Sequence, residues 1–110
     1  MWTAPQFEGW LDVTERVERL RQAIEISHRC KAVHIRSTRV IEGCEGETTW
    51  EGIVEIFDLL DHPVAKRCYA WSFMDNGARG YTIILDASPV NTPEIAVKAA
   101  LAAQARQVPD

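Results

Sequence analysis

The side chains best suited to metal binding or thiol chemistry are three histidines and three cysteines (His28, His34, His62, Cys30, Cys44 and Cys68). His28, Cys30 and His34 lie close together in the sequence, and nitrogen and sulfur ligands suit zinc. Their spacing falls across an expected break between a helix and a strand, so no single helix face directs two of them at one ion. We therefore expect neither a metal nor another cofactor. His28 extends the apolar stripe of a helix, and Cys30 packs as a small apolar residue.

His34 and Glu55 form a second candidate for chemistry. Both fall on expected strands, on the same face of the sheet and one position out of register. A carboxylate beside an imidazole can tune a general base. The sequence offers no evident nucleophile or oxyanion hole to accompany them, so we assign no catalytic residue. A small enzyme that uses His34 with Glu55 remains an alternative.

The segment "HPVAKRCYAW", residues 62–71, places two basic residues directly before Cys68. Neighbouring cations can lower the pKa of a thiol, which makes an enzyme that uses Cys68 a further alternative. Pro63, however, fixes its own φ angle and favours an extended His62, as in a bend between two strands. We therefore expect His62 and Pro63 to form a turn and Cys68 to be a packed thiol.

The pattern of apolar residues predicts a helix near each end of the chain. Asp12 and Glu15 are typical of a helix start, and an apolar stripe follows towards Arg29 (Val13, Val17, Leu20 and Ile24). Near the other end, Thr92 can cap a helix that has Pro93 in its first position and an alanine-rich run over residues 95–105.

Four runs rich in β-branched and aromatic residues lie between these helices (residues 32–42, 48–59, 67–74 and 79–87). The short connections between them predict an antiparallel meander. We expect one α+β domain over residues 1–110, a two-layer α-β-β-β-β-α fold with a four-stranded antiparallel sheet. The two helices are expected to cover the same aromatic face of the sheet.

This arrangement predicts the pairing of the last two strands. Aromatic residues of the third strand and apolar residues of the fourth share the buried face if residues 75–77 form a three-residue turn, which pairs Trp71 with Tyr81. The same register places Phe73 opposite Gly52, where an aromatic ring can cover a residue that has no side chain.

The opposite face of the sheet is expected to be mixed in polarity, and it is more apolar than a wholly solvent-exposed surface. The candidate binding residues on this face are His34, Arg36, Ile53, Glu55, Met74 and Ile84. We expect this face to mediate self-association as a homodimer, or to bind a protein partner or a small ligand. Alternatively, it accepts one of the two helices.

The charge pattern bears on the partners. Seven basic residues fall within residues 16–39 and seven acidic residues within 42–61, while the net charge of −4 disfavours binding to nucleic acid. We expect the two blocks to neutralise each other across a hairpin centred on residues 45–46, with Arg36 opposite Glu55 and Arg39 on the other face. A charged docking face is the alternative.

The segment "TWEGIVEIFDLLDHPVAKRCYAWSF" resembles a group of small uncharacterised bacterial proteins with the pattern W-x-G-x-V-x-x-F…H-P-x-A-x-x-x-Y-A-W. The matching residues are Trp50, Gly52, Val54, Phe57, His62, Pro63, Ala65, Tyr69, Ala70 and Trp71. The resemblance covers about a quarter of the chain. It implies a bacterial cytoplasmic protein and assigns no catalytic residue.

These features predict a small cytoplasmic binding module rather than an enzyme. No apolar run approaches the roughly 18 residues of a membrane span, and the first ten residues lack the pattern of a signal peptide. The alternative to an interaction module is a metabolite-binding protein with a pocket between helices and sheet, near Trp50, Tyr69 and Trp71.

Overall fold

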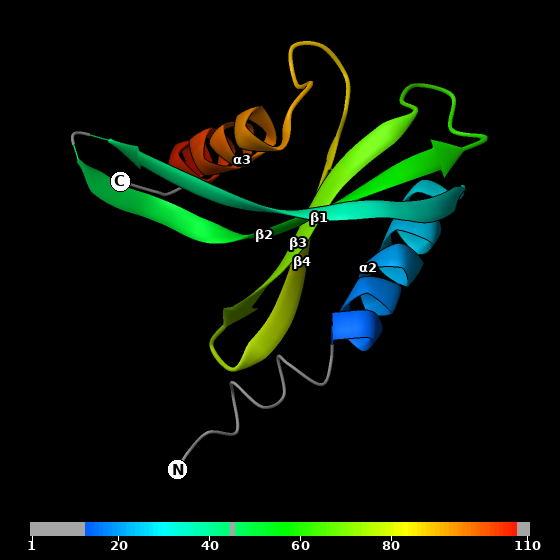
Figure 1. Ribbon diagram of the computed structural model, residues 1–110, viewed down its shortest axis with the longest axis horizontal. Helices are drawn as coiled ribbons and strands as arrows, with labels where there is room; N and C mark the ends of the chain where they lie inside the picture. The colour runs from blue at the N-terminus through cyan, green and yellow to red at the C-terminus, as the bar shows by residue number, and fades with distance from the viewer. Residues whose placement is uncertain (1–12, 45, 108–110) are drawn as a thin grey trace.

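The computed structural model describes residues 13–44 and 46–107, which form two helices and four strands (Figure 1). In chain order these are α2 (Val13–His28), β1 (Lys31–Cys44), β2 (Glu47–Leu60), β3 (Arg67–Asp75), β4 (Ala78–Leu85) and α3 (Pro93–Gln107). The strands form one antiparallel sheet in the order β1-β2-β3-β4. The predicted α+β class and the meander between two helices are confirmed.

Local contacts explain the ends of the helices. The Thr92 hydroxyl accepts a hydrogen bond from the backbone N–H of Ile95 at 3.1 Å, so Thr92 caps α3 as predicted. Helix α2 ends where Arg29 adopts a φ of 55° and its N–H donates to the carbonyl of Glu25 at 2.8 Å. The cap predicted at Asp12 lies outside the described residues.

The two helices pack against opposite faces of the sheet. Helix α2 covers a cluster that includes Phe57 and Cys68, whereas α3 covers a cluster that includes Ile56 and Tyr69. Successive residues of a strand point to opposite faces, so these two clusters lie on different sides of the sheet. The prediction that both helices share the aromatic face is therefore wrong, and the alternative that the mixed face accepts one of them is confirmed. The single sheet therefore lies between the two helices, with one helix on each side. Figure 1 shows the two helices well separated from each other.

Because both faces of the sheet are buried, the register of the β3–β4 hairpin differs from the predicted one. Asn76 and Gly77 have φ angles of 54° and 82° and form a two-residue turn, which pairs Trp71 with Thr82 instead of Tyr81. The predicted three-residue turn is wrong because it assumed that β4 buries only one face. The consecutive apolar residues at positions 83–85 instead supply both clusters.

A β-bulge interrupts the pairing of β1 with β2 between His34 and Arg36. The extra residue reverses which side chains face α2, so Arg36 lies opposite Ile56, and Ser37 lies opposite Glu55. The predicted pairing of Arg36 with Glu55 is wrong. The basic and acidic blocks do meet across this hairpin, but through other residues, including the ion pair that Arg39 forms with Glu51.

Phe73 does cover a glycine, but that glycine is Gly80 on β4. A β-carbon added at Gly80 would lie 2.5 Å from Cζ of the Phe73 ring. Gly52 is covered instead by the ring of Trp50, two residues earlier on the same strand.

We expect Gly80→Ala to lower the free energy of unfolding by about 1 kcal/mol, because the new methyl group must displace the Phe73 ring. In a Phe73→Ala background the same change has no ring to displace, and the better strand propensity of alanine makes it neutral or stabilising. Urea unfolding of the four proteins measures the coupling. Equal effects of Gly80→Ala in both backgrounds would contradict this packing.

Candidate functional site

Glu55 is the charged residue that the structure buries, with 1% of its surface exposed among the described residues. His34 Nε2 lies 2.8 Å from Oε1 of this carboxylate, and the Ser37 hydroxyl donates a hydrogen bond to the same oxygen. Arg16 approaches the second oxygen from α2, at 3.5 Å. The predicted proximity of His34 and Glu55 is thus confirmed, and two further partners join them.

The β-bulge in β1 makes this arrangement possible. Residues 34 and 37 differ by an odd number, so in a regular strand their side chains would point to opposite faces. The extra residue at the bulge brings both His34 and Ser37 to the face of Glu55. The His34 ring also packs on Phe57, with ring centroids 5.2 Å apart at an angle of 60°.

Glu55 also marks the point where the sheet divides. The described pairing of β2 with β3 runs from Asp58 and Arg67 to Glu55 and Ala70. Residues 51–54 of β2 continue to pair with β1, and residues 71–74 of β3 continue to pair with β4, but no pairs join these two segments. Figure 1 shows the β1–β2 arm and the β3–β4 arm pointing in different directions. We call this division the fork.

Several side chains converge on the Glu55 carboxylate, and they do not form a chain for proton transfer. His34 and Ser37 both bind the same carboxylate oxygen. In a nucleophile triad, by contrast, the histidine must bond the hydroxyl itself. Because Glu55 is buried, a substrate cannot reach its carboxylate. The geometry therefore supports an anchor that ties α2 and β1 to the fork.

Cys68 is a packed thiol, as expected. It is fully buried in the cluster beneath α2, and burial raises its pKa to about 12. Arg67 does not approach this thiol, because its side chain bonds Asp58 at 3.0 Å on the other face. The basic residues before Cys68 thus do not activate it.

His62 forms the turn that was predicted for it. Its Nδ1 accepts hydrogen bonds from the backbone N–H groups of Val64 and Ala65, both at 3.0 Å. Its ring also lies against that of His28, with centroids 5.4 Å apart. His28 and His34 therefore have separate surroundings, and within the described part of the chain no three His, Cys, Asp or Glu residues are grouped as metal ligands.

The predicted binding residues divide between the two faces. His34, Ile53, Glu55 and Met74 lie on the face that α2 covers in part. Arg36 and Ile84 lie on the opposite face, where Ile84 packs against the cluster beneath α3. Their assignment to the same surface is wrong, because the bulge and the two-residue turn each shift the alternation of faces by one residue.

Beyond the first turns of α2, both arms expose large apolar side chains on this face. The exposed fractions are 56% for Ile41, 40% for Ile53, 61% for Met74 and 36% for Tyr81. We call these four residues the fork patch. Sequence reasoning missed Ile41 and Tyr81. The Asn76-Gly77 pair, a strong signal for a two-residue turn, could have placed Tyr81 correctly.

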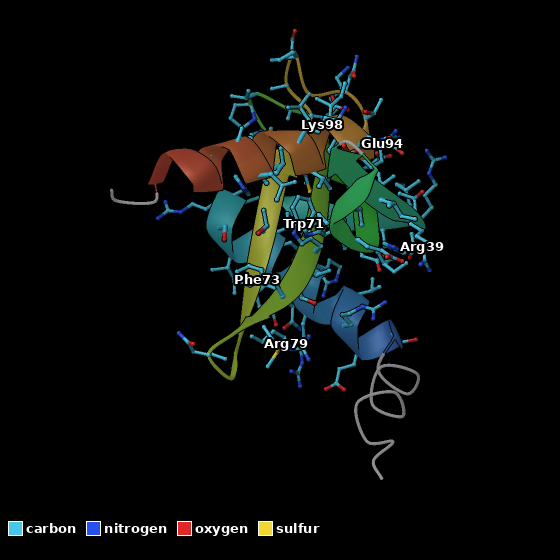
Figure 2. All side chains as sticks on the ribbon, turned by 90° about the vertical axis from the view of Figure 1, so that its left-hand side faces the viewer. Arg39, Trp71, Phe73, Arg79, Glu94 and Lys98 are labelled. Atoms are coloured by element: carbon cyan, nitrogen blue, oxygen red, sulfur yellow. The ribbon has the colours of Figure 1, made fainter. Side chains whose placement is uncertain are left out.

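Charged side chains flank the fork patch. Arg39 and Glu51 lie on the β1–β2 arm, and Arg79 lies beside Met74 on the β3–β4 arm. Figure 2 shows Arg39 and Arg79 on separate arms. Arg79 donates to the Ser72 hydroxyl at 3.3 Å, and among the described side chains no carboxylate forms an ion pair with it.

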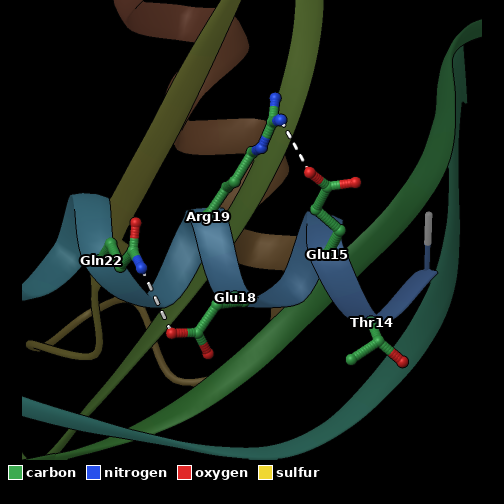
Figure 3. A pocket seen from close by; sticks show the side chains of 5 residues that line it. All are labelled: Thr14, Glu15, Glu18, Arg19 and Gln22. Carbon is green, nitrogen blue, oxygen red and sulfur yellow. Dashed lines mark hydrogen bonds and ion pairs between the residues drawn. The ribbon is translucent and has the colours of Figure 1, made fainter.

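Trp50, Tyr69 and Trp71, near which a pocket was expected, belong to the cluster beneath α3, where Tyr69 and Trp71 are buried and Trp50 is partly buried. The two indole rings pack edge to face with centroids 5.4 Å apart, and the Tyr69 hydroxyl donates to Asp86 at 2.6 Å. Burial and the Asp86 carboxylate raise the pKa of Tyr69. An open hollow lies along α2, lined by Thr14, Glu15, Glu18, Arg19 and Gln22. Figure 3 shows two bonds within this lining, from Arg19 to Glu15 and from Gln22 to Glu18.

Comparisons with protein families, with curated proteins and with solved structures found no match to this chain. Among the described residues, neither helix is long and apolar enough to cross a membrane.

We expect Glu55→Gln to lower the free energy of unfolding by about 2–4 kcal/mol, because the neutral amide leaves the Arg16 and His34 side chains without their charged partner. Glu94→Gln is the control, since Glu94 is an exposed glutamate on α3, outside the fork face. Its effect should stay within about 0.5 kcal/mol. Urea unfolding measures both, and equal losses would show that Glu55 is no anchor.

We expect Cys68 to resist alkylation by iodoacetamide at pH 8, since its pKa of about 12 leaves almost no thiolate and its side chain is buried. The partly exposed Cys30 is the internal comparison, and both thiols should react in urea. Peptide mass spectrometry locates the modified residue. Faster labelling of Cys68 than of Cys30 in the folded protein would contradict the packed-thiol assignment.

Proposed function

We propose that this protein is a small binding module of the bacterial cytoplasm that self-associates through the fork face. The fork face comprises the fork patch and its flanking charges (Arg39, Glu51 and Arg79). Its biochemical role is then to bind a second copy of itself through this face, and not to catalyse a reaction.

The observation that carries this proposal is the exposure of the fork patch. Four large apolar side chains on one side of a sheet expose between 36% and 61% of their surface, although both adjoining clusters are well buried. Apolar surface concentrated in this way, with a charged rim, is typical of an interaction site. The inner edges of the fork add backbone groups that have no strand partner in the described part of the chain, and such edges favour association.

The two alternatives have less support. A metabolite binder needs a cavity, whereas the residues expected to line one pack against each other. A small enzyme that uses His34 with Glu55, or Cys68, needs an accessible reactive group, whereas Glu55 and Cys68 are buried. The resemblance to small bacterial proteins stays a prediction and supplies the proposed cellular location.

Native mass spectrometry and sedimentation equilibrium test the proposal. We expect a dimer that Ile53→Glu weakens at least tenfold, because a charge would replace an apolar contact at the centre of the face. Ile26→Glu is the matched control, since Ile26 is 78% exposed on α2, outside the fork patch, and should leave the dimer unchanged. Ile84→Glu is unsuitable as a probe because Ile84 packs beneath α3.

A wild-type chain that stays monomeric at high concentration would refute self-association. Equal weakening by Ile53→Glu and Ile26→Glu would show that the dimer uses another surface.

A further inference from the structure

We infer that two copies of this chain clasp each other fork to fork about a two-fold axis. The β3–β4 arm of each copy then lies on the β1–β2 arm of the other, and Arg79 faces Glu51 of the second copy. This inference rests on the proposed self-association and specifies its geometry.

The two arms are complementary in what they expose. The β1–β2 arm presents Ile41 and Ile53 beside Glu51, and the β3–β4 arm presents Met74 and Tyr81 beside Arg79. Each arm thus offers two apolar side chains. The β1–β2 arm also offers the Glu51 carboxylate, which Arg39 contacts through one oxygen, and the β3–β4 arm offers the Arg79 guanidinium. A two-fold axis makes every contact occur twice, so the pairing of unlike arms satisfies both copies at once.

The charges are available for this pairing. Arg39 bonds Glu51 through Oε2, while Oε1 has no bonding partner within the described residues. The Glu51 side chain is 43% exposed and can therefore accept a second cation. Arg79 donates to the Ser72 hydroxyl, and no carboxylate among the described side chains pairs with it. Joining Arg79 to Glu51 across the interface places the acid between two arginines.

The backbone favours the same clasp. The inner edges of β2 at residues 51–54 and of β3 at residues 71–74 have no ladder partners among the described residues. The outer edge of β1, in contrast, carries the bulge between His34 and Arg36, a feature that protects edges from pairing. A second copy at the fork would therefore cover the less protected edges, together with the fork patch.

Charge reversal and mixing test the clasp. Glu51→Arg puts arginines at both contact positions, and Arg79→Glu puts acids at both, so each variant alone should dimerise at least tenfold more weakly. Mixed together, the two variants place opposite charges at both contacts. Native mass spectrometry distinguishes the species by mass, and we expect the heterodimer to form within about threefold of the wild-type affinity while both homodimers stay weak. Lys66→Glu, an exposed charge reversal outside the fork face, should leave dimerisation unchanged.

The outcomes separate the two claims. A monomeric wild-type chain would overturn the proposed function and the clasp together. A wild-type dimer sensitive to Ile53→Glu, but with no preference for the heterodimer in the mixture, would retain self-association and overturn the clasp alone. Urea unfolding of each variant establishes that a lost dimer is not a lost fold.

Discussion

The buried carboxylate of Glu55 lies where the elements of this protein meet. Glu55 receives Arg16 from α2 and His34 and Ser37 from β1, at the last described pair between β2 and β3. Removing a carboxylate from water costs several kcal/mol unless charged and polar partners surround it. The position of α2, the bulge in β1 and the division of the sheet must therefore all be compatible with that one set of contacts.

The second constraint is that the sheet buries both faces. Helix α2 covers one face and α3 the other, so β2, β3 and β4 must supply apolar side chains in both directions. An ordinary alternating strand serves one face only. Consecutive apolar residues in β4 meet this demand, and the bulge lets β1 place Ala32 beneath α2 and Val40 beneath α3.

Covering both faces with two separate helices leaves the ends of the sheet uncovered. The fork patch lies on the part of the α2 face that α2 does not reach, and the arms that carry it are no longer paired to each other. The anchor at Glu55 thus holds the arms at their base, while their far ends keep apolar side chains and strand edges open. A supported base with an exposed apolar surface is the arrangement on which the proposed self-association rests.

The sequence by itself determined the elements, because their signals are local. The Thr92-Pro93 helix start, the bend at His62 and Pro63, and the four strand-like runs all depend on neighbouring residues, and the structure retains them. The closeness of His34 and Glu55 also followed from simple alternation. Which face each helix covers, the bulge before Arg36 and the fork beyond Glu55 were decided by the tertiary structure alone. One residue of slip in a strand reverses every side chain, and only contacts between distant segments select the register.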